Sequence, residues 1–357
     1  MKKSVLLVSM FSKDEVPYSL NYTDILKDNE IDYNIIYWNR NKNSELYRRG
    51  NEFFFNVECK TGGRKIRKFH KMLKYAITIR KLAKLSQYTH VIVLSTIPGI
   101  FLFDILLKKY KKRYIFDIRD YTHEKNCLYY MLEKKIILNS KFTTISSKGF
   151  EVFLPETSYV VTHNISNVED SISRANEIKS KDKYVIGFVG NVRYATENIK
   201  LIEWFSEDEK FNIEYWGNTT NDFKLMKQFE STKVKFHGAY KNSDKRKIYE
   251  KIDFINAIYG SEGLEVTTAI PNRLYDAVIF KKPIITSKYT YLGQIVEDYD
   301  LGIVVDIYNE DVRSIIEAYA REFDADFFTE KCNTYLAEVS EEQVAFIDKI
   351  KKFLLED

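Results

Sequence analysis

The sequence predicts an α/β protein with two doubly wound parallel-sheet domains in tandem. Its 357 residues exceed the length at which a single hydrophobic core usually stops growing, so two domains are expected. Short apolar runs alternate with helical stretches in both halves of the chain. This alternation is typical of parallel sheets that helices cover on both faces.

In the first half, the apolar runs are short and rich in β-branched and aromatic residues, as strands usually are. We expect strands at 5–10, 33–38, 53–57, 90–95, 114–117, 142–145 and 159–162. We expect helices at 64–87, 100–110, 127–139 and 148–153. These elements predict a first domain over residues 1–166.

A polar stretch over 167–183 lacks strand character and is interpreted as a linker. The alternation then restarts. We expect strands at 184–189, 212–216, 234–237, 254–258, 284–286 and 303–305, and helices at 197–205, 222–230, 244–251, 272–280, 292–297 and 312–322. A second domain over 184–338 follows, and a final helical segment over 339–357 is expected to pack back on the first domain.

The three cysteines lie far apart and form neither a metal-binding spacing nor a disulfide set, which fits a reducing cytoplasm. The apolar run near the N-terminus soon meets charged residues, so it indicates a strand rather than a signal peptide. No apolar run approaches the roughly 18 residues of a membrane span. We therefore expect a cytoplasmic protein, either free or peripheral on the inner face of the cell membrane.

The positive charge is concentrated in a basic segment that begins at Arg64 and ends at Lys84 and contains no Asp or Glu. Phe69 and Leu73 would lie near one side of this helix. Such a helix could lie on an anionic membrane surface. It could equally pack on the first sheet with a solvated basic face, and both can hold together. Nucleic acid is not an expected partner, because no recognised binding module is present.

The segment around Pro271 carries the clearest sign of a binding site. In parallel sheets, ligands bind beyond the carboxyl ends of the strands. Pro271, Asn272 and Arg273 open a helix there, and its free N–H groups and positive dipole end suit a diphosphate. Arg273 could add a bidentate phosphate contact, and Asp276, one turn further on, could bind ribose hydroxyls. The alternative is an ordinary helix start with an Arg–Asp surface pair.

Three strings in this region occur in a recognisable order. They are Pro-Asn-Arg-Leu-Tyr-Asp at 271–276, Lys-Lys-Pro-Ile-Ile-Thr-Ser at 281–287 and Leu-Gly-Ile-Val-Val at 301–305. Together they resemble the donor-binding block of family 4-like glycosyltransferases of bacterial capsule and exopolysaccharide synthesis. The segments 186–193, 236–240 and 249–258, and 114–120 and 162–164 in the first half, resemble further family segments in the same order. The resemblance implies the GT-B fold, in which two Rossmann-like domains face an interdomain cleft.

The resemblance also implies a nucleotide-sugar site on the second domain. Its expected residues are Gly190, Asn191, Arg193, Tyr240, Glu262, Pro271, Asn272, Arg273 and Asp276. Gly190 could instead only relieve a tight turn, Arg193 and Glu262 could be solvated, and Tyr240 could be a surface aromatic. The chain departs from the family where Asn198 replaces a phosphate-binding lysine and where Thr268 replaces the first glutamate of a Glu-x7-Glu pair.

In the first domain, polar residues follow the strand expected at 114–117. Asp117 and Arg119 share one face by alternation, and Asp120 points towards the end of the strand. Asp120 or His123 could contact the acceptor hydroxyl or the transferred sugar. The alternative is an ion-pair network that joins the strand to the next helix.

The resemblance implies a glycosyltransferase that moves a sugar from a nucleotide-sugar to a lipid-linked saccharide acceptor in surface polysaccharide synthesis. Retention and independence of metals are expected, with no cofactor other than the donor and with a UDP-sugar favoured over a GDP-sugar. Arg273 and the helix dipole would then stabilise the leaving diphosphate, while Asp120 would be the base if the enzyme inverts. The alternatives are a non-catalytic partner subunit and a nucleotide-sugar epimerase.

Overall fold

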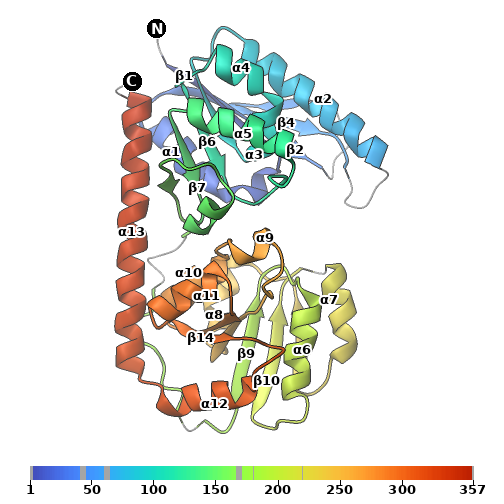
Figure 1. Cartoon of the computed structure of the whole chain (residues 1–357), viewed down its shortest axis with the longest axis vertical. Coiled ribbons are helices and arrows are strands. Elements are labelled where there is room, and N and C mark those ends of the chain that lie inside the picture. The colour runs from blue at the N-terminus through green and yellow to red at the C-terminus, as the bar shows by residue number, and fades with distance from the viewer. Residues whose placement is uncertain are drawn as a thin grey trace. The chain divides into compact units, whose positions relative to one another are not determined.

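The computed structural model describes residues 3–40, 46–59, 65–165, 171–179, 181–218 and 220–355. The chain divides into two compact units: unit 1 is Met1–His163 with Glu342–Asp357, and unit 2 is Asn164–Glu341 (Figure 1). The segment 171–179, which we expected to be part of a linker, belongs to unit 2, because Ala175 and Ile178 are buried in its core. Arg64, the first residue of the expected basic segment, lies outside the described residues.

Unit 1 is built on an eight-stranded sheet in the order β3-β4-β2-β1-β5-β6-β7-β8. Its strands are β1 Ser4–Ser9, β2 Asp32–Asn39, β3 Tyr47–Arg49, β4 Glu52–Asn56, β5 His90–Leu94, β6 Tyr114–Ile118, β7 Phe142–Ile145 and β8 Val160–Val161. All neighbours pair in parallel except β3 and β4. The sequence analysis missed β3, since this exposed edge strand buries no side chain and so shows no apolar pattern.

The helices of unit 1 are α1 Leu20–Asp28, α2 Lys65–Lys84, α3 Thr96–Phe101, α4 Phe103–Lys108 and α5 Cys127–Asn139, with 3-10 turns at Lys13–Glu15, Pro17–Ser19 and Lys148–Val152. The single helix expected at 100–110 is two helices that meet at Leu102. Gly99 explains the close approach of α3 to the sheet, because a Cβ there would lie 2.5 Å from the ring of Phe116. No helix in the described ranges combines the length and apolar character needed to cross a membrane.

Unit 2 is built on a six-stranded parallel sheet in the order β11-β10-β9-β12-β13-β14. Its strands are β9 Tyr184–Val189, β10 Phe211–Trp216, β11 Val234–Gly238, β12 Phe254–Ala257, β13 Ile284–Ser287 and β14 Gly302–Val305. Its helices are α6 Ala195–Phe205, α7 Asn221–Met226, α8 Lys245–Tyr249, α9 Leu264–Thr267, α10 Asn272–Phe280, α11 Tyr291–Asp298 and α12 Val312–Glu322, with 3-10 turns at Lys227–Phe229 and Asn242–Asp244. The short α9 lies where the sequence indicated only a loop.

The last helix, α13 Ala325–Leu355, starts in unit 2 and ends in unit 1. Asp324 caps it, since its Oδ1 accepts hydrogen bonds from two backbone N–H groups of the first turn at 3.0 Å. The C-terminal part buries Phe346, Ile350 and Phe353 in the core of unit 1 with β1 and β2. The C-terminal part of the final helix is therefore part of the unit 1 core, whereas its first part, with Cys332 and Tyr335, belongs to the core of unit 2.

Hydrogen bonds and an ion pair hold α13 at the point where it enters unit 1. The N–H of His163 donates to Oε1 of Gln343 at 3.0 Å, and Nε2 of His163 lies 2.7 Å from Glu342. Lys148 approaches the same carboxylate at 2.6 Å. The hydrogen bond from His163, followed by the contact with Lys148, lowers the pKa of Glu342 to about 2.

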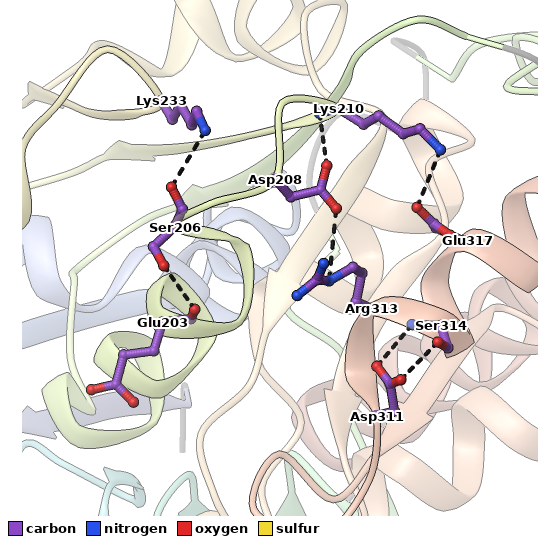
Figure 2. A network of polar contacts seen from close by, with 9 residues as sticks. All are labelled: Glu203, Ser206, Asp208, Lys210, Lys233, Asp311, Arg313, Ser314 and Glu317. Atoms are coloured by element: carbon purple, nitrogen blue, oxygen red, sulfur yellow. Dashed lines mark hydrogen bonds and ion pairs between the residues drawn. The ribbon is translucent and has the colours of Figure 1, made fainter.

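At the amino edge of the second sheet, a network of polar contacts ties α12 to the loop before β10 (Figure 2). Nε of Arg313 lies 3.7 Å from Asp208, and Lys210 lies 3.5 Å from Glu317. Asp208 also accepts a hydrogen bond from the N–H of Lys210 at 2.8 Å. These contacts brace the sheet at the edge opposite to the carboxyl ends of its strands.

Both sheets have a point at which the direction of winding reverses. In unit 1, β1 pairs with β2 on one side and β5 on the other, and in unit 2, β9 pairs with β10 and β12. Doubly wound sheets bind ligands just beyond the carboxyl ends of the strands at such a point. These two places are the candidate site regions.

Candidate functional site

In unit 2, Arg273 of α10 joins the carboxyl ends of β9 and β12, the two strands at the reversal point. Its Nε donates to the carbonyl of Val189 at 2.8 Å. Its Nη1 donates to the carbonyl of Asn256 at 3.3 Å and to the hydroxyl of Tyr259. The side chain therefore organises the edge at which a ligand of this fold would bind.

The guanidinium of Arg273 is buried and lies 3.3 Å from the ring centre of Phe188. Its Nη2 makes no hydrogen bond with any described residue, and it lies 3.3 Å from the position that a Cβ on Gly190 would take. Gly190 has a φ of +134° and carries no side chain that would shield Nη2. Two N–H groups thus remain available for an acceptor placed over Gly190.

The interpretation of Arg273 and Asp276 as a surface ion pair is wrong. Asp276 is buried and pairs instead with Lys245 of α8, whose Nζ lies 2.9 and 3.0 Å from its two oxygens. The hydroxyl of Tyr249 donates to the same carboxylate at 2.8 Å. A ribose bound at Asp276 would therefore compete with Lys245, a residue that the sequence analysis did not select.

Tyr240 belongs to the same cluster. Burial raises its pKa, the charge of Asp276 raises it further, and Arg273 opposes both effects. The pKa of Tyr249 is likewise raised, first by burial and then by Asp276. The structure thus brings together Tyr240, Arg273 and Asp276, three of the residues expected to bind the nucleotide.

Three glycines, one for each strand, lie at the carboxyl ends of β9, β10 and β11. The N–H of Gly190 donates to the carbonyl of Trp216 at 2.8 Å, and that of Gly217 donates to the carbonyl of Gly238 at 2.7 Å. A Cβ on Gly217 would lie 1.7 Å from the carbonyl oxygen of Gly190, so only glycine fits there. We call Gly190, Gly217 and Gly238 the glycine ledge; Gly190 and Gly238 are half-buried, and Gly217 is buried.

Four other expected residues lie on exposed loops or at the helix start. Arg193 is exposed. Burial raises the pKa of Tyr259, and the charge of Arg273 and, more weakly, that of Arg193 oppose this effect. Asn191 is exposed and accepts a hydrogen bond from Asn218 at 3.0 Å. Pro271 is the N-cap of α10, and Asn272 is exposed in its first turn.

Glu262 is exposed on the loop after β12. Its charge raises the pKa of Tyr308, an effect that follows those of burial and of Glu197. It forms no hydrogen bond with Arg273 or Asp276. The structure therefore does not join Glu262 to the Arg273 cluster.

The departure from the family at Asn198 has a structural explanation. Asn198 is fully buried, and its Nδ2 donates to the carbonyls of Arg193 and Tyr194 at 3.2 and 2.9 Å. Its Oδ1 accepts from Nδ2 of Asn256 at 2.8 Å. Asn198 therefore holds the loop after β9 against β12 and cannot act as a phosphate-binding cation.

Unit 1 has a pocket of about 200 Å³ beyond the carboxyl ends of β1, β5 and β6. It is lined by Met10, Phe11, Ser95, Thr96, Ile97, Arg119, Asp120, Tyr121 and Thr122. We call it the unit 1 pocket. Asp120 is exposed and lines it. His123 is exposed outside it and packs edge-on against Tyr129 at 5.5 Å. Of the two expected acceptor-side residues, Asp120 thus lines the unit 1 pocket, and His123 is not among its lining residues.

The alternative interpretation of this segment was an Asp–Arg–Asp network that joins the strand to a helix; of this network the structure shows the ion pair of Asp117 and Arg119, which is buried beside the unit 1 pocket. Nε and Nη2 of Arg119 lie 2.6 and 2.9 Å from the two oxygens of Asp117. The guanidinium lies 4.1 Å from the ring centre of Tyr18, and Tyr22 donates to Asp117 at 2.7 Å. This network anchors the loop that carries Asp120.

Ser95 is a further residue of the unit 1 pocket that the sequence does not reveal. It follows β5 with a φ of +86°, a conformation that costs a non-glycine residue on the order of 1–3 kcal/mol. Its hydroxyl and that of Tyr121 are buried without a partner among the described residues. Such strain and unsatisfied polarity often occur at binding sites.

No protein-family model matches the chain, and no curated protein matches it. Solved structures, in contrast, do match the chain. Sucrose-phosphate synthase from Thermosynechococcus elongatus is similar with a TM-score of 0.72 and 10% identity over 99% of this chain and 100% of that one. A glycosyltransferase from Rickettsia africae has a TM-score of 0.65 and 12% identity over 100% of both chains. HepE of Anabaena, solved in complex with UDP, has a TM-score of 0.65 and 11% identity over 98% of this chain and 100% of that one. The two parallel-sheet α/β units thus form the GT-B fold of these glycosyltransferases.

Proposed function

We propose that this chain is a glycosyltransferase that moves a sugar from a nucleotide-sugar to a hydroxyl group of a saccharide acceptor. The observation that carries the proposal is the place of Arg273, which joins β9 and β12 at the reversal point and keeps Nη2 available beside Gly190. A cation at this edge of a doubly wound sheet suits a phosphate group.

In the proposed complex, the diphosphate of the donor lies over the glycine ledge. Nη2 of Arg273 and the backbone N–H groups at the start of α10 donate to its oxygens. Arg193, exposed beside Tyr259, adds a second positive charge. The base lies on the side of Tyr240, and a UDP-sugar is favoured. HepE, one of the similar structures, was solved with UDP.

The proposed reaction retains the anomeric configuration and needs neither a metal nor a cofactor. The bond between the anomeric carbon and the diphosphate oxygen breaks, and the acceptor oxygen bonds to that carbon on the same face. The departing diphosphate takes the proton of the acceptor hydroxyl. Arg273 and the α10 dipole stabilise the negative charge that develops on the leaving group. In an inverting enzyme, Asp120 would take the proton instead.

The acceptor is proposed to bind at the unit 1 pocket, where Ser95 and Tyr121 offer hydroxyl groups without partners and Asp120 offers a carboxylate. A lipid-linked saccharide of surface polysaccharide synthesis is the proposed acceptor. This role would place the protein at the inner face of the cell membrane.

The surface of α2 supports contact with an anionic membrane. Phe69, Leu73 and Ile77 are spaced four residues apart on α2, and 65%, 46% and 46% of their surfaces are exposed. Exposed lysines flank them, while the opposite face buries Tyr75 and Ile79 in unit 1. An apolar stripe between lysines fits the interface of an anionic bilayer.

Vesicle sedimentation tests this contact. Leu73→Glu should reduce binding to phosphatidylcholine vesicles that contain phosphatidylglycerol, whereas Leu225→Glu, at an exposed leucine of α7 in unit 2, should not. Equal binding of both variants and the wild type would remove membrane contact from the proposal.

Titration with UDP and GDP, followed by thermal unfolding, tests the donor site. A nucleotide at about 100 times its Kd should stabilise the protein by roughly 2.7 kcal/mol. Arg193→Ala should lose this stabilisation, whereas Arg321→Ala, at an exposed arginine of α12, should keep it. Arg273 is unsuitable as the only test, because its structural bonds would be lost as well.

Two observations favour a second function. Lys245 occupies both oxygens of Asp276, and Thr268 stands where the family has a glutamate. Both features would suit a non-catalytic partner subunit that no longer binds a donor. The same titration distinguishes the two, since stabilisation by neither nucleotide would favour the partner subunit.

A further inference from the structure

Asp276 of α10, the carboxylate expected to bind the ribose of the donor, is already occupied by two side chains of α8. Nζ of Lys245 donates to Oδ1 at 2.9 Å and to Oδ2 at 3.0 Å, and the hydroxyl of Tyr249 donates to Oδ2 at 2.8 Å. Lys245 and Tyr249 are four residues apart on α8, so they share one face of that helix. Among the described residues, these two are the only partners of the Asp276 side chain.

The hydrogen bonds leave little of this carboxylate for a ligand. An ionised carboxylate can accept about four hydrogen bonds, two at each oxygen. Oδ2 already accepts two and Oδ1 accepts one, so a single position on Oδ1 remains. A ribose held through both its 2′- and 3′-hydroxyls would need one position on each oxygen. Asp276 therefore has room for one ribose hydroxyl but not for two.

Burial keeps both partners of Asp276 in place. Tyr249 is fully buried, and its ring stacks on that of Phe280 with 4.6 Å between the ring centres. Lys245 is the outer partner, since 20% of its side chain is exposed, compared with 11% for Asp276. A ribose that used both oxygens would have to displace Lys245. Removing one partner of such an ion pair leaves an uncompensated charge, which is strongly unfavourable.

A nucleotide without a 2′-hydroxyl avoids this conflict. Ribose and 2′-deoxyribose share the 3′-hydroxyl, and the position left on Oδ1 is sufficient for it. The other proposed contacts of the donor, made by Arg273, Arg193 and the glycine ledge, concern the diphosphate and are the same for both sugars. The site thus contains the contacts that the two kinds of nucleotide have in common.

We propose that the donor site of unit 2 does not recognise the 2′-hydroxyl, so that it accepts a 2′-deoxyribonucleoside diphosphate sugar as readily as a ribonucleoside one. Lys245 is the specificity-determining residue, because it occupies both oxygens of Asp276 from the outer side. The proposal rests on the proposed function, which places the nucleotide beside Asp276. It extends that function to a further class of donor.

Isothermal titration calorimetry of the full chain with UDP and with 2′-deoxy-UDP tests the proposal. A hydrogen bond from the 2′-hydroxyl to a carboxylate would favour UDP by about tenfold or more in Kd. Without this bond, the two Kd values of the wild type should agree within about threefold. A larger preference for UDP would overturn the proposal.

Lys245→Ala tests whether Lys245 is the cause. The substitution removes the ammonium group and leaves at least one free position on each oxygen of Asp276. UDP should then bind about tenfold or more tightly than 2′-deoxy-UDP. Lys247→Ala, at an exposed lysine of the same helix, is the matched control and should keep equal binding. Equal binding in Lys245→Ala would overturn the role of Lys245.

Asp276→Asn keeps the test decisive if Lys245→Ala folds poorly. Asparagine keeps the shape of the side chain and one acceptor oxygen but lacks the carboxylate. Because neither nucleotide uses a 2′-hydroxyl at this position, the substitution should change both Kd values by the same factor. A loss of affinity confined to UDP would show that Asp276 recognises the 2′-hydroxyl and would overturn the proposal.

The same titration separates the two levels of the argument. Binding of neither nucleotide to the wild type would overturn the proposed donor site and this inference with it. A preference for UDP would overturn the inference alone, because the donor site itself would then be supported.

Discussion

Arg273 is expected to stabilise unit 2 regardless of any ligand, and Arg273→Met separates this role from a catalytic one. Methionine keeps much of the length of the side chain but donates no hydrogen bond. The carbonyls of Val189 and Asn256 and the hydroxyl of Tyr259 would lose their donor. At about 1 kcal/mol for each lost hydrogen bond, unit 2 should lose about 3 kcal/mol of unfolding free energy.

The assay is thermal unfolding without ligand. For a unit of the size of Asn164–Glu341, each kcal/mol shifts the midpoint by about 2–4 °C, so the transition of unit 2 should fall by roughly 6–12 °C. The control is Arg193→Met, because Arg193 is exposed; its midpoint should stay within about 2 °C of the wild type. If Arg273→Met unfolds at the wild-type temperature, the three hydrogen bonds do not support the sheet edge and the structural argument fails.

Three further predictions follow from single side chains. Gly217→Ala should lose UDP binding in the same titration, because its Cβ would lie 1.7 Å from the carbonyl oxygen of Gly190; unchanged binding would contradict a donor site at the glycine ledge. Glu133→Gln should remove a pH dependence: since the folded-state pKa is raised from 4.5 to about 8, the contribution of Glu133 is fully present below pH 4.5 and is lost as the pH rises towards 8. Between pH 5 and 7, urea unfolding should show the wild type losing about 3 kcal/mol relative to this variant, and parallel curves would refute the burial argument. Glu342→Gln should remove the opposite dependence, because His163 lowers the pKa of Glu342 to about 2 and the stabilisation is therefore present above pH 4.5 and lost as the pH falls towards 2. After allowance for partial exposure this contribution is about 1–2 kcal/mol, and acid-unfolding curves that coincide with those of the wild type would exclude it.

The regular elements could be predicted because each has a local pattern. The strand Tyr184–Val189 and the helices Cys127–Asn139, Asn272–Phe280 and Val312–Glu322 have the bounds expected from the sequence. Apolar runs and amphipathic stretches indicate which residues are buried, and this signal depends only on residues that are close together in the sequence. Two of the missed elements, Tyr47–Arg49 and Leu264–Thr267, are too short or too exposed to show such a pattern. The helix Leu20–Asp28 was also missed, although it buries Tyr22, Ile25 and Leu26.

The candidate site could be predicted only in part. The sequence indicated that Gly190 and Arg273 lie at strand and helix ends, and parallel-sheet geometry brings such ends to one edge. It did not indicate that Arg273 donates to Val189, a position 84 residues away. Nor did it indicate that Asp276 pairs with Lys245. These partners depend on strand order and register, which no local pattern encodes.

The sequence by itself determined the two-domain α/β class, the places where strands end, and a basic amphipathic helix in the first half, because periodicity and composition act over neighbouring residues. Only the tertiary structure decided what those strand ends do. In the fold, the buried Asn198 is hydrogen-bonded both to the loop after β9 and to Asn256 of β12. Arg273 donates hydrogen bonds to the carbonyls of Val189 in β9 and Asn256 in β12. A buried polar side chain must be satisfied by whatever the fold brings next to it, and that neighbour is set by chain topology rather than by the residue itself.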